Sequence, residues 1–303
     1  MSVDLPSVPS VEELPTPTPG EVLVIVGPTA SGKTELSLRL AERFDGELVN
    51  ADSVQIVRGF DLGSGKPTSE ERARAPHHLF DAVGPDEPID AQRYAQRASE
   101  VLRDILARGR TPIVVGGTFL WVKALLYGLA PAPPGDPALR ERHRVFAEER
   151  GREALHARLA EVDPAAAARL SPNDLVRVSR ALEIWELSGT TQTALFEAHG
   201  FREARWRHRL LGLARSPEEL DRRIEARARA FLAAGWLDEV RALVERGWGS
   251  CRAMGSVGYK EVLAHLRGEL PEAELLPAIV RATRVFVRRQ RTWLRDEPVR
   301  WLR

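Results

Sequence analysis

The sequence has almost no cysteine, no long apolar segment and no recognisable export signal. Its 303 residues include one cysteine, Cys251, which excludes an intramolecular disulfide framework and a cysteine-based metal cluster. The longest apolar segments, such as 22–26 and 113–115, have the length of strands, whereas a membrane span needs ~18–20 residues. The N-terminus has no basic segment followed by an apolar core, which argues against a secretory signal. We therefore expect a soluble, cytoplasmic protein without a membrane partner.

The net charge of +1 conceals an uneven distribution of charge along the chain. Residues 201–303 carry 22 Lys and Arg against 14 Asp and Glu, and the rest of the chain offsets this basic excess. Such asymmetry between parts of a chain is typical of proteins that bind a polyanion. A basic helix face that is merely solvated produces the same pattern, so the charge distribution alone leaves both interpretations open.

The first third of the chain alternates between strand and helix patterns. Apolar segments at 21–26, 48–51 and 111–115 predict buried strands, and the amphipathic segment 91–108 predicts a helix. Strands that alternate with helices indicate a parallel α/β sheet. Residues 1–20 contain five prolines and no periodic pattern, which predicts a disordered tail.

The pattern changes at the proline-rich segment 131–135. Residues 136–199 are rich in Ala, Arg and Glu, with helical periodicity and no strand pattern. The remaining patterns predict a strand near 210–213 and long helices at 217–246 and 271–295. We therefore predict an α/β core interrupted by an all-helical insertion domain, with the core over residues 21–130 and 200–303 and the insertion over 131–199.

The strongest local signal is a glycine-rich loop between the first strand and the first helix. The loop consists of Gly27, Pro28, Thr29, Ala30, Ser31, Gly32, Lys33 and Thr34, which match the pattern G-x-x-x-x-G-K-[ST] of ATP-binding and other nucleotide-binding P-loops. In such loops the backbone amides and the helix N-terminus bind phosphate oxygens, and the final hydroxyl binds Mg²⁺. We predict a phosphate or diphosphate site with Thr34 as metal ligand, the alternative being a chance glycine-rich turn.

The residues that identify an ordinary nucleotide hydrolase are missing. Such enzymes hold Mg²⁺ with an Asp at the end of a later strand, but Gly-Gly-Thr follows the strand that ends at Val115. No guanine-reading Asn/Thr-Lys-x-Asp element is present either, which argues against a GTPase. Asp52 follows the second strand and faces the ligand end of a parallel sheet. It suits either a general base or a turn cap, and spacing alone favours the turn cap.

Eight short blocks together resemble one enzyme family. They are Gly27-Pro-Thr-Ala-Ser-Gly-Lys-Thr34, Asp52-Ser-Val-Gln55, Gly63-Ser-Gly-Lys-Pro67, Pro76-His-His-Leu79, Val115-Gly-Gly-Thr118, Arg180-Ala-Leu-Glu183, Gly258-Tyr-Lys260 and Arg289-Gln-Arg-Thr-Trp-Leu-Arg295. In this order, and over nearly the whole chain, they resemble the bacterial tRNA dimethylallyltransferases. Three of the four lysines, Lys33, Lys66 and Lys260, lie inside these blocks.

The resemblance implies prenyl transfer instead of phosphoryl transfer. Members of the family move a dimethylallyl group from dimethylallyl diphosphate to the exocyclic N6 of adenosine 37, next to the anticodon, in tRNAs that read codons beginning with U. By this resemblance Asp52 is the general base, and Lys33 and a Mg²⁺ on Thr34 stabilise the diphosphate leaving group. Thr118 matches a residue at the reacting centre, and Arg140 matches one that assists the leaving group.

The resemblance also implies contacts with the tRNA anticodon arm, whose acceptor base the enzyme must extrude. The implied contacts are Asp52, Ser53, Val54 and Gln55, then Val176, Arg177 and Arg180 of the insertion, then Gly258, Tyr259 and Lys260, and finally Arg281, Arg284 and Arg288 of a basic helix. Arginines of that helix would bind phosphates and stack on bases. We expect a monomer, and we expect Trp293 and Trp301 to pack in the core.

The chain departs from the family pattern at a few positions, and other functions fit parts of it. Val57 and Trp121 stand where tyrosine is usual, Ser64-Gly65 replaces Thr-Ala, and Arg288 replaces lysine. The change at Val57 puts a hydroxyl contact in question. An enzyme that prenylates free adenine nucleotides would need neither the insertion nor the basic C-terminus. A small-molecule kinase is a second alternative, but no Asp follows the third strand to hold its metal ion. A third alternative is a non-catalytic RNA-binding protein, which the presence of Lys33, Thr34, Asp52 and Thr118 argues against.

Overall fold

The computed structural model describes residues 11–295 and 297–302, in two compact units. The first unit comprises Met1–Leu126 and Arg205–Arg303 and holds the strands, whereas the second, Tyr127–Ala204, is helical. The sequence analysis expects the helical insertion over 131–199.

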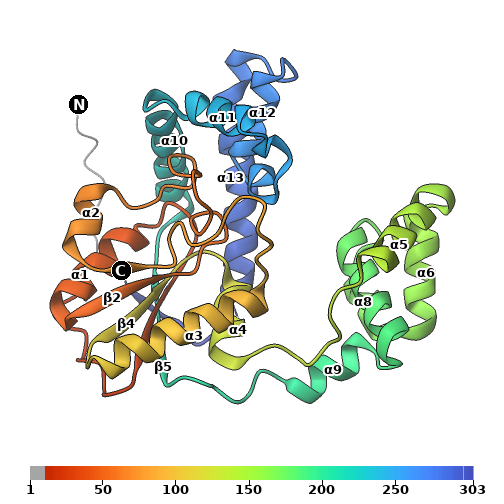
Figure 1. Ribbon diagram of the computed structural model, residues 1–303, viewed down its shortest axis with the longest axis horizontal. Helices are drawn as coiled ribbons and strands as arrows, with labels where there is room; N and C mark the ends of the chain where they lie inside the picture. The colour runs from red at the N-terminus through yellow and green to blue at the C-terminus, as the bar shows by residue number, and fades with distance from the viewer. Residues whose placement is uncertain (1–10, 296, 303) are drawn as a thin grey trace. The chain divides into compact units, whose positions relative to one another are not determined.

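The first unit is built on a six-stranded sheet with the order β3-β2-β4-β1-β5-β6 (Figure 1). Its strands are β1 Val22–Val26, β2 Gly46–Asn50, β3 His77–His78, β4 Thr111–Val115, β5 His208–Leu213 and β6 Arg300–Leu302. Every pair of neighbours is parallel, which confirms the predicted parallel α/β sheet. Because the chain leaves β1 for β2 on one side and returns to β5 on the other, β1 lies centrally, where ligand crevices form.

Two helices, α1 Lys33–Phe44 and α3 Ala91–Ala107, pack against the strands of this sheet. The other helices of the first unit are α2 Ser69–Arg74, α4 Phe119–Tyr127, α10 Pro217–Ala233, α11 Trp236–Glu245, α12 Tyr259–Leu266 and α13 Glu272–Leu294, with short 3₁₀ turns at Trp248–Ser250 and Arg252–Gly255. Side chains alternate along a strand, so Leu23 and Ile25 of β1 share one core cluster with Leu36 and Leu40 of α1. The long helix α3 lies against β2 and β4 on the other face (Figure 1).

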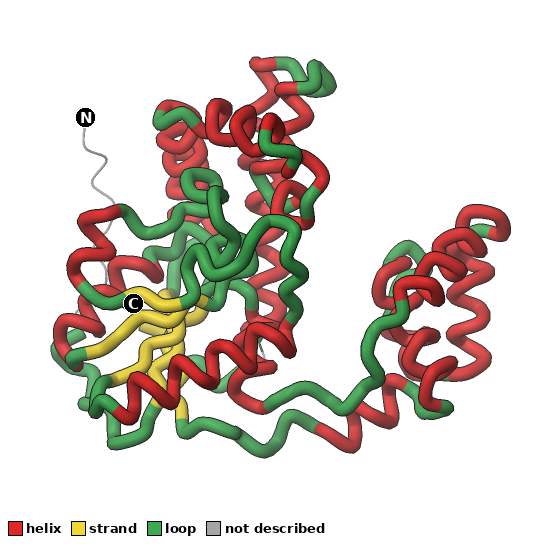
Figure 2. Tube along the Cα trace, in the orientation of Figure 1, coloured by secondary structure: helices red, strands yellow, loops and turns green. Residues whose placement is uncertain are grey.

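The loops that follow the strands gather at the carboxyl edge of the sheet (Figure 2). This edge joins the glycine-rich loop after β1, Asp52 after β2 and Thr118 after β4. Gly116 must be glycine there, because a Cβ would overlap the backbone of Ala51. The parallel topology thus brings together motifs that are far apart in the sequence.

The helical unit has an apolar core of its own. Its helices are α5 Pro137–Arg150, α6 Arg152–Val162, α7 Pro164–Arg169, α8 Leu175–Ser188 and α9 Gln192–His199. Leu155 and Leu159 of α6 pack with Val178 and Leu182 of α8. Aspartate or threonine side chains cap α5, α7, α8 and α9, which explains where these helices begin.

Residues 11–20 pack on the first unit, so the predicted disordered tail is wrong for these residues. Leu14 is only 3% exposed and joins the apolar cluster beneath α1. Arg43 donates a hydrogen bond to the Glu12 carbonyl at 2.6 Å, and Arg209 donates one to the Pro15 carbonyl at 2.8 Å. The proline-rich composition of this segment gave no indication that Leu14 would be buried in the core. Residues 1–10 of the predicted tail lie outside the described residues.

The predicted helical segment over 217–246 consists of two helices, α10 and α11. Gly235, with a φ of 98°, separates α10 from α11, and the apolar pattern continues across this break. The strands β3 and β6 are too short to produce a sequence signal and were not predicted. No described helix has both the length and the apolar content needed to cross a membrane.

Candidate active site

The glycine-rich loop forms a phosphate-type cradle between β1 and α1. Gly32, with a φ of 101°, precedes the first helical residue, and Ala30 also has a positive φ, 63°. The Lys33 ammonium donates hydrogen bonds to the carbonyl oxygens of Gly27 and Pro28, at 3.0 and 2.8 Å. Because α1 begins here, its free amides and its dipole favour an anion at this point.

Three arginines near α10 converge on this loop, and the sequence analysis did not identify them. Arg223 Nε donates to the Ala30 carbonyl at 2.6 Å, and Arg215 Nε donates to the Ser31 carbonyl at 3.2 Å. Both arginines lie near the Glu219 carboxylate, yet Arg215 Nη2 and Arg223 Nη1 are buried and have no hydrogen-bond partner among the described residues. Arg227 donates to a neighbouring loop carbonyl at 3.1 Å. Arg223 and Arg227 are four residues apart and therefore lie on one face of α10, and this spacing was the sequence signal that could have identified them.

The surroundings of the loop are strongly electropositive. Burial, with a smaller contribution from the Arg227 guanidinium, lowers the pKa of Lys33 to about 8, although Asp52 acts in the opposite direction. Burial also lowers the pKa of Arg223 and of Arg227. Buried cations that lack full compensation are stabilised by a multiply charged anion.

Asp52 caps a turn and also faces the cavity, so both functions that the sequence left open are compatible with its position. Its Oδ1 accepts hydrogen bonds from the backbone N–H groups of Val54 and Gln55, at 2.9 and 3.3 Å. Its side chain lines the same cavity as Lys33, with Oδ2 on the side of Gly117. One oxygen therefore holds the turn while the other is directed towards a ligand.

Thr118 joins the ends of β2 and β4 beside this carboxylate. Its hydroxyl oxygen accepts a hydrogen bond from the Ser53 N–H at 3.0 Å and lies 3.2 Å from the Ser53 hydroxyl. Its own N–H donates to the Ala51 carbonyl at 3.1 Å. These contacts hold two of the predicted site residues, Ser53 and Thr118, at the carboxyl edge of the sheet.

Gln55 and Lys66 hold the loop that follows the Asp52 turn. The Gln55 amide donates to the carbonyls of Ser64 and Gly65, both at 3.0 Å. The buried Lys66 ammonium donates to the Val57 carbonyl at 2.7 Å and pairs with carboxylates, among them Asp81. Val57 is itself buried, so its replacement of a tyrosine changes the core beneath the loop. Trp121, the other aromatic departure, stacks on Tyr94 in the core.

Gln290 of α13 ties the glycine-rich loop to the end of β4. Its Oε1 accepts the Thr29 N–H at 2.9 Å, and its Nε2 donates to the Gly117 carbonyl at 3.1 Å. The side chain is buried, and it occupies the space that a Cβ at Gly117 would need. Gln290 belongs to the family block 289–295, whose pattern by itself indicates no function for this residue.

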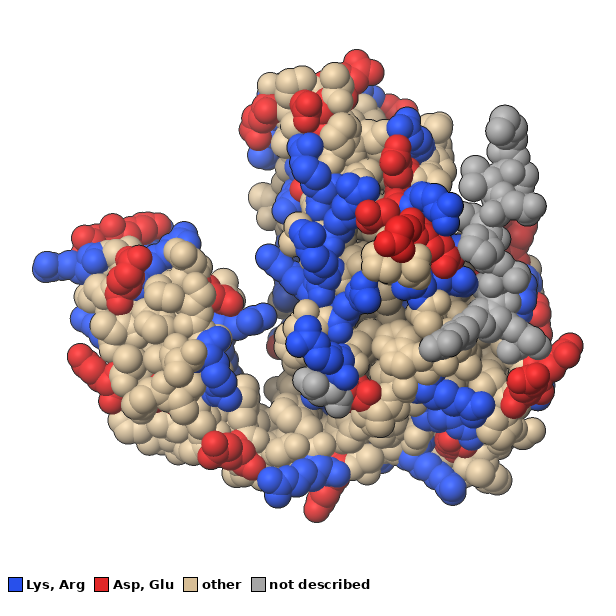
Figure 3. All heavy atoms as spheres, turned by 180° about the vertical axis from the view of Figure 1, so that it is seen from behind, with Lys and Arg blue, Asp and Glu red and all other residues tan. Residues whose placement is uncertain are grey.

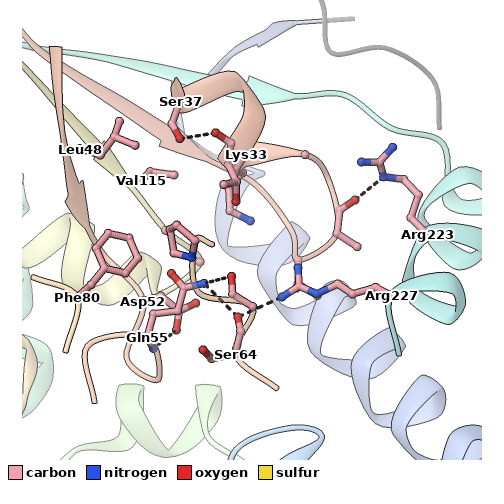
Figure 4. A pocket seen from close by; sticks show the side chains of 18 of the residues that line it. Lys33, Ser37, Leu48, Asp52, Gln55, Ser64, Phe80, Val115, Arg223 and Arg227 are labelled. Carbon is pink, nitrogen blue, oxygen red and sulfur yellow. Dashed lines mark hydrogen bonds between the residues drawn. The ribbon is translucent and has the colours of Figure 1, made fainter. Parts of the chain in front are cut away.

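These elements enclose a cavity of about 460 Å³ with two unlike walls (Figure 4). The cationic wall contains Arg223 and Arg227, and the apolar wall contains Leu48, Phe80 and Val115, with Lys33 and Asp52 between them. Such a cavity suits a ligand that has an anionic group at one end and a short apolar chain at the other.

A second cavity, of about 340 Å³, adjoins the first and shares Asp52 and Arg227 with it. The segment from Gly255 to Lys260 forms part of its wall. Gly258 has a φ of 91°, and a Cβ there would overlap the ring of Trp236, so only glycine fits. The carboxylate of the first cavity is therefore accessible from the second.

Tyr259 is a core residue, so its predicted contact with RNA is wrong for the side chain. The ring is fully buried against Phe60 and Trp236, and its hydroxyl donates to Glu239 at 2.6 Å. Burial is the main reason why the pKa of Tyr259 is raised far above its ordinary value. The neighbouring Lys260 side chain is more than half exposed.

The basic residues of α13 form a band on one face of the unit (Figure 3). Arg288 is exposed. Arg284 Nε lies 3.0 Å from Asp221 Oδ1, and Arg281 Nη2 lies 3.5 Å from Glu274 Oε2. Two of the three arginines thus have an acidic neighbour, while the band remains accessible.

Trp293 and Trp301 are not core residues, contrary to prediction. Trp293 is 47% exposed and lines a further pocket, and Trp301 is exposed on the edge strand β6. The core positions of α13 are taken by smaller or polar side chains such as Gln290 and Leu294. Aromatic character alone could not distinguish these two situations.

The remaining predicted residues belong to the helical unit. Arg140 and Arg180 both pair with the fully buried Glu183, and Arg140 Nε lies 2.9 Å from it. Burial acts to raise the pKa of Glu183, but these two arginines are its positive partners, and with them the pKa lies below its ordinary value. Val176 and Arg177 are exposed at the start of α8. Arg140 is thus in a different compact unit from the glycine-rich loop.

The parallel sheet, the glycine-rich loop after its central strand and the buried cations around that loop define a P-loop α/β protein with a cationic cavity beside the loop. A family model described as IPP transferase matches residues 55–297. The chain belongs to this family of prenyl-transferring enzymes.

Individual relatives agree with this assignment. The chain is 66% identical over 294 residues to a tRNA dimethylallyltransferase of Sorangium cellulosum, covering 97% of this chain and 94% of that protein. It is 54% identical to the enzyme of the same name from Anaeromyxobacter dehalogenans, over 91% and 92% of the two chains. The crystal structure of the tRNA isopentenylpyrophosphate transferase of Bacillus halodurans is similar with a TM-score of 0.69 at 35% identity, over 93% and 89% of the chains. A eukaryotic dimethylallyltransferase that acts on tRNA gives a TM-score of 0.76 at 28% identity, over 90% and 69%.

Proposed function

We propose that the protein transfers the dimethylallyl group of dimethylallyl diphosphate to the exocyclic N6 of adenosine 37 in tRNAs that read codons beginning with U. The relatives named tRNA dimethylallyltransferase support tRNA prenylation. Within the chain, the observation that carries the proposal is the cavity with one cationic and one apolar wall, between which Asp52 lies. A diphosphate with a five-carbon tail has the matching chemistry.

The cationic wall binds the leaving group. When the bond between C1 and oxygen of the donor breaks, negative charge accumulates on the diphosphate. Loop amides, Lys33, Arg223 and Arg227 are already in place to stabilise it, which lowers the barrier without reorganisation. Lys33 exchanges its present acceptors, the carbonyls of Gly27 and Pro28, for phosphate oxygens.

Asp52 acts on the acceptor. As the N6 lone pair forms the new bond to C1, the diphosphate leaves and the amine nitrogen must lose a proton. The Asp52 oxygen that is not used in the turn accepts this proton. Thr118 and Ser53 hold the adjacent strand ends and orient the acceptor base beside the carboxylate.

A Mg²⁺ ion fits the glycine-rich loop through Thr34, which lines the cavity beside Lys33. Within the described part of the chain, no group of three or more His, Cys, Asp or Glu is placed to hold a metal. The Thr34 hydroxyl oxygen would hold the ion, as the last residue of such loops does. When bound, the ion adds positive charge at the leaving group.

The RNA contacts of the proposal come from both units. Arg281, Arg284 and Arg288 of α13 and the segment around Lys260 supply positive charge on the first unit. By the family resemblance alone, we extend the proposal to Val176, Arg177 and Arg180 of the helical unit as RNA contacts and to Arg140, which pairs with Glu183 in that unit, as a residue that assists the leaving group. The proposal includes a protein that acts as a monomer, in the cytoplasm.

The test is transfer of labelled dimethylallyl diphosphate, with Mg²⁺, to unmodified tRNA, AMP and ATP in parallel. We expect label in tRNA alone, and nuclease digestion should place it on N6 of adenosine 37. The same tRNA with guanosine at that position is the matched control and should remain unlabelled. Label in AMP or ATP would instead indicate a nucleotide prenyltransferase, and ATP consumption without label would indicate a kinase.

A further inference from the structure

Large apolar side chains are exposed around one small pocket of the first unit. Leu120 of α4 is 48% exposed, and Phe286 and Trp293 of α13 are 38% and 47% exposed. All three line a pocket of about 260 Å³, together with Thr118 and Arg289. A cluster of exposed apolar groups is typical of a binding surface. We refer to this site as the tryptophan pocket.

One wall of the tryptophan pocket is a flank of α13. Phe286, Arg289 and Trp293 are three and four residues apart, so they lie on the same side of the helix. The buried side of the helix is formed by others, including Gln290 and Leu294. The flank therefore presents two flat rings with a guanidinium between them.

The tryptophan pocket adjoins the second cavity, from which the Asp52 carboxylate is accessible and in which we place the acceptor adenosine. The two share Ser53, Thr118, Phe286 and Arg289. Ser53 directly follows Asp52, and Thr118 accepts its backbone N–H. A polymer such as RNA can therefore place one unit in the second cavity and the next unit in the tryptophan pocket.

The lining of the pocket selects among such chains. It includes the cation Arg289 and, among the described residues that form it, no acidic side chain. Aromatic rings beside an arginine are the combination that binds unpaired bases, because the rings stack on the base while the guanidinium binds phosphate or stacks.

We propose that the tryptophan pocket binds an unpaired base that adjoins the acceptor adenosine in the RNA, with Trp293 as the stacking surface. This inference rests on the RNA substrate of the proposed function. It makes Trp293 a residue that selects RNA with an extruded acceptor, and it explains why so large a side chain is exposed at this position.

The test is a cycle of protein and RNA variants, read by the binding anisotropy of a labelled anticodon stem-loop. Trp293→Ala should weaken binding by about 5- to 100-fold, which is the usual effect of losing one base–ring stack. Trp293→Phe should restore most of the affinity. Val244→Ala, an exposed side chain of α11 outside the pocket and away from the basic residues of α13, should have no effect.

The RNA partner of the cycle has an abasic site on the 5′ or the 3′ side of the acceptor. With one of these two RNAs, wild-type protein should bind as weakly as Trp293→Ala binds intact RNA, and the variant should show no further loss. Unchanged affinity of Trp293→Ala for intact RNA, or additive losses with both abasic RNAs, would overturn the proposal. Because binding is measured separately from transfer, an absence of prenyl transfer would count against the proposed function alone. Thermal unfolding of each variant verifies that it is folded.

Discussion

Asp52 divides its two carboxylate oxygens between the backbone and the cavity. Oδ1 accepts the N–H groups of Val54 and Gln55, a task that an asparagine oxygen performs equally well. Asp52→Asn should therefore keep the turn and remove only the proton acceptor. We expect single-turnover transfer to fall by about 10²–10⁴-fold while RNA affinity stays within about twofold.

Asp52→Ala is the comparison variant, because it removes the cap as well as the base. It should lose transfer to a similar extent and also unfold at a lower temperature. An Asp52→Asn protein that transfers at the wild-type rate would show that the carboxylate serves only the turn.

Lys33 introduces a pH dependence at the loop. Its pKa in the folded protein is about 8, below its ordinary value of 10.5, chiefly because it is buried. The folded state thus binds fewer protons than the unfolded chain between these pH values, so this group favours folding more as pH rises through that window. Affinity for the diphosphate donor should do the opposite and decrease above about pH 8, because the ammonium is lost.

The measurement is the donor Kd from pH 6.5 to 9.5 for wild-type protein and for Lys33→Met. The variant should bind more weakly throughout and should retain only the pH dependence that belongs to the ligand. If the two proteins show parallel profiles, Lys33 is not the titrating group.

At the scale of elements, α13 connects the band of basic residues with the glycine-rich loop. Gln290 uses both ends of its amide, on the Thr29 N–H and on the Gly117 carbonyl. Gln290→Leu leaves both backbone groups unpaired in a buried place, so we expect the donor KM to rise by about 5- to 50-fold. The RNA KM should change little.

Gln290→Glu has nearly the same shape and keeps an acceptor for Thr29, so its donor KM should be closer to wild type than that of the leucine variant. Thr292→Val, which removes a hydroxyl bonded only within α13, is the control on the same helix. A Gln290→Leu protein with an unchanged donor KM would show that the loop holds its conformation without this contact.

At the scale of the whole molecule, the C-terminal third of the sequence has an excess of basic residues, and those of α13 lie together on one face of the first unit. Replacing Arg281, Arg284 and Arg288 with alanine should weaken RNA binding and reduce the slope of log K against log salt by about 2–3. The two arginines with acidic neighbours should contribute less than Arg288. The measurement is RNA affinity between about 50 and 300 mM salt.

The control removes two positive charges outside α13. Arg229→Ala with Arg241→Ala takes away two exposed arginines of α10 and α11 that pair within their own helices. That variant should leave the slope unchanged. If the triple variant also keeps the wild-type slope, the basic face of α13 is only solvated.

The sequence by itself determined the parallel α/β class, the glycine-rich loop and the family, because these depend on local patterns of a few consecutive residues. The strands at 22–26 and 111–115 and the loop that ends at Thr34 are such patterns. Only the tertiary structure decided which distant side chains complete the site. Arg223, Arg227 and Gln290 approach the loop from more than 180 residues away, and no local pattern encodes that approach.

Burial was likewise decided by the tertiary structure. Tyr259 and Trp293 both stand in family blocks and both are aromatic, yet one is fully buried and the other is half exposed in a pocket. Leu14, in a proline-rich segment, is held in the core because the surface of α1 and the sheet covers it. The reason is general: exposure depends on what the rest of the chain places opposite a side chain, whereas the sequence records only the side chain itself.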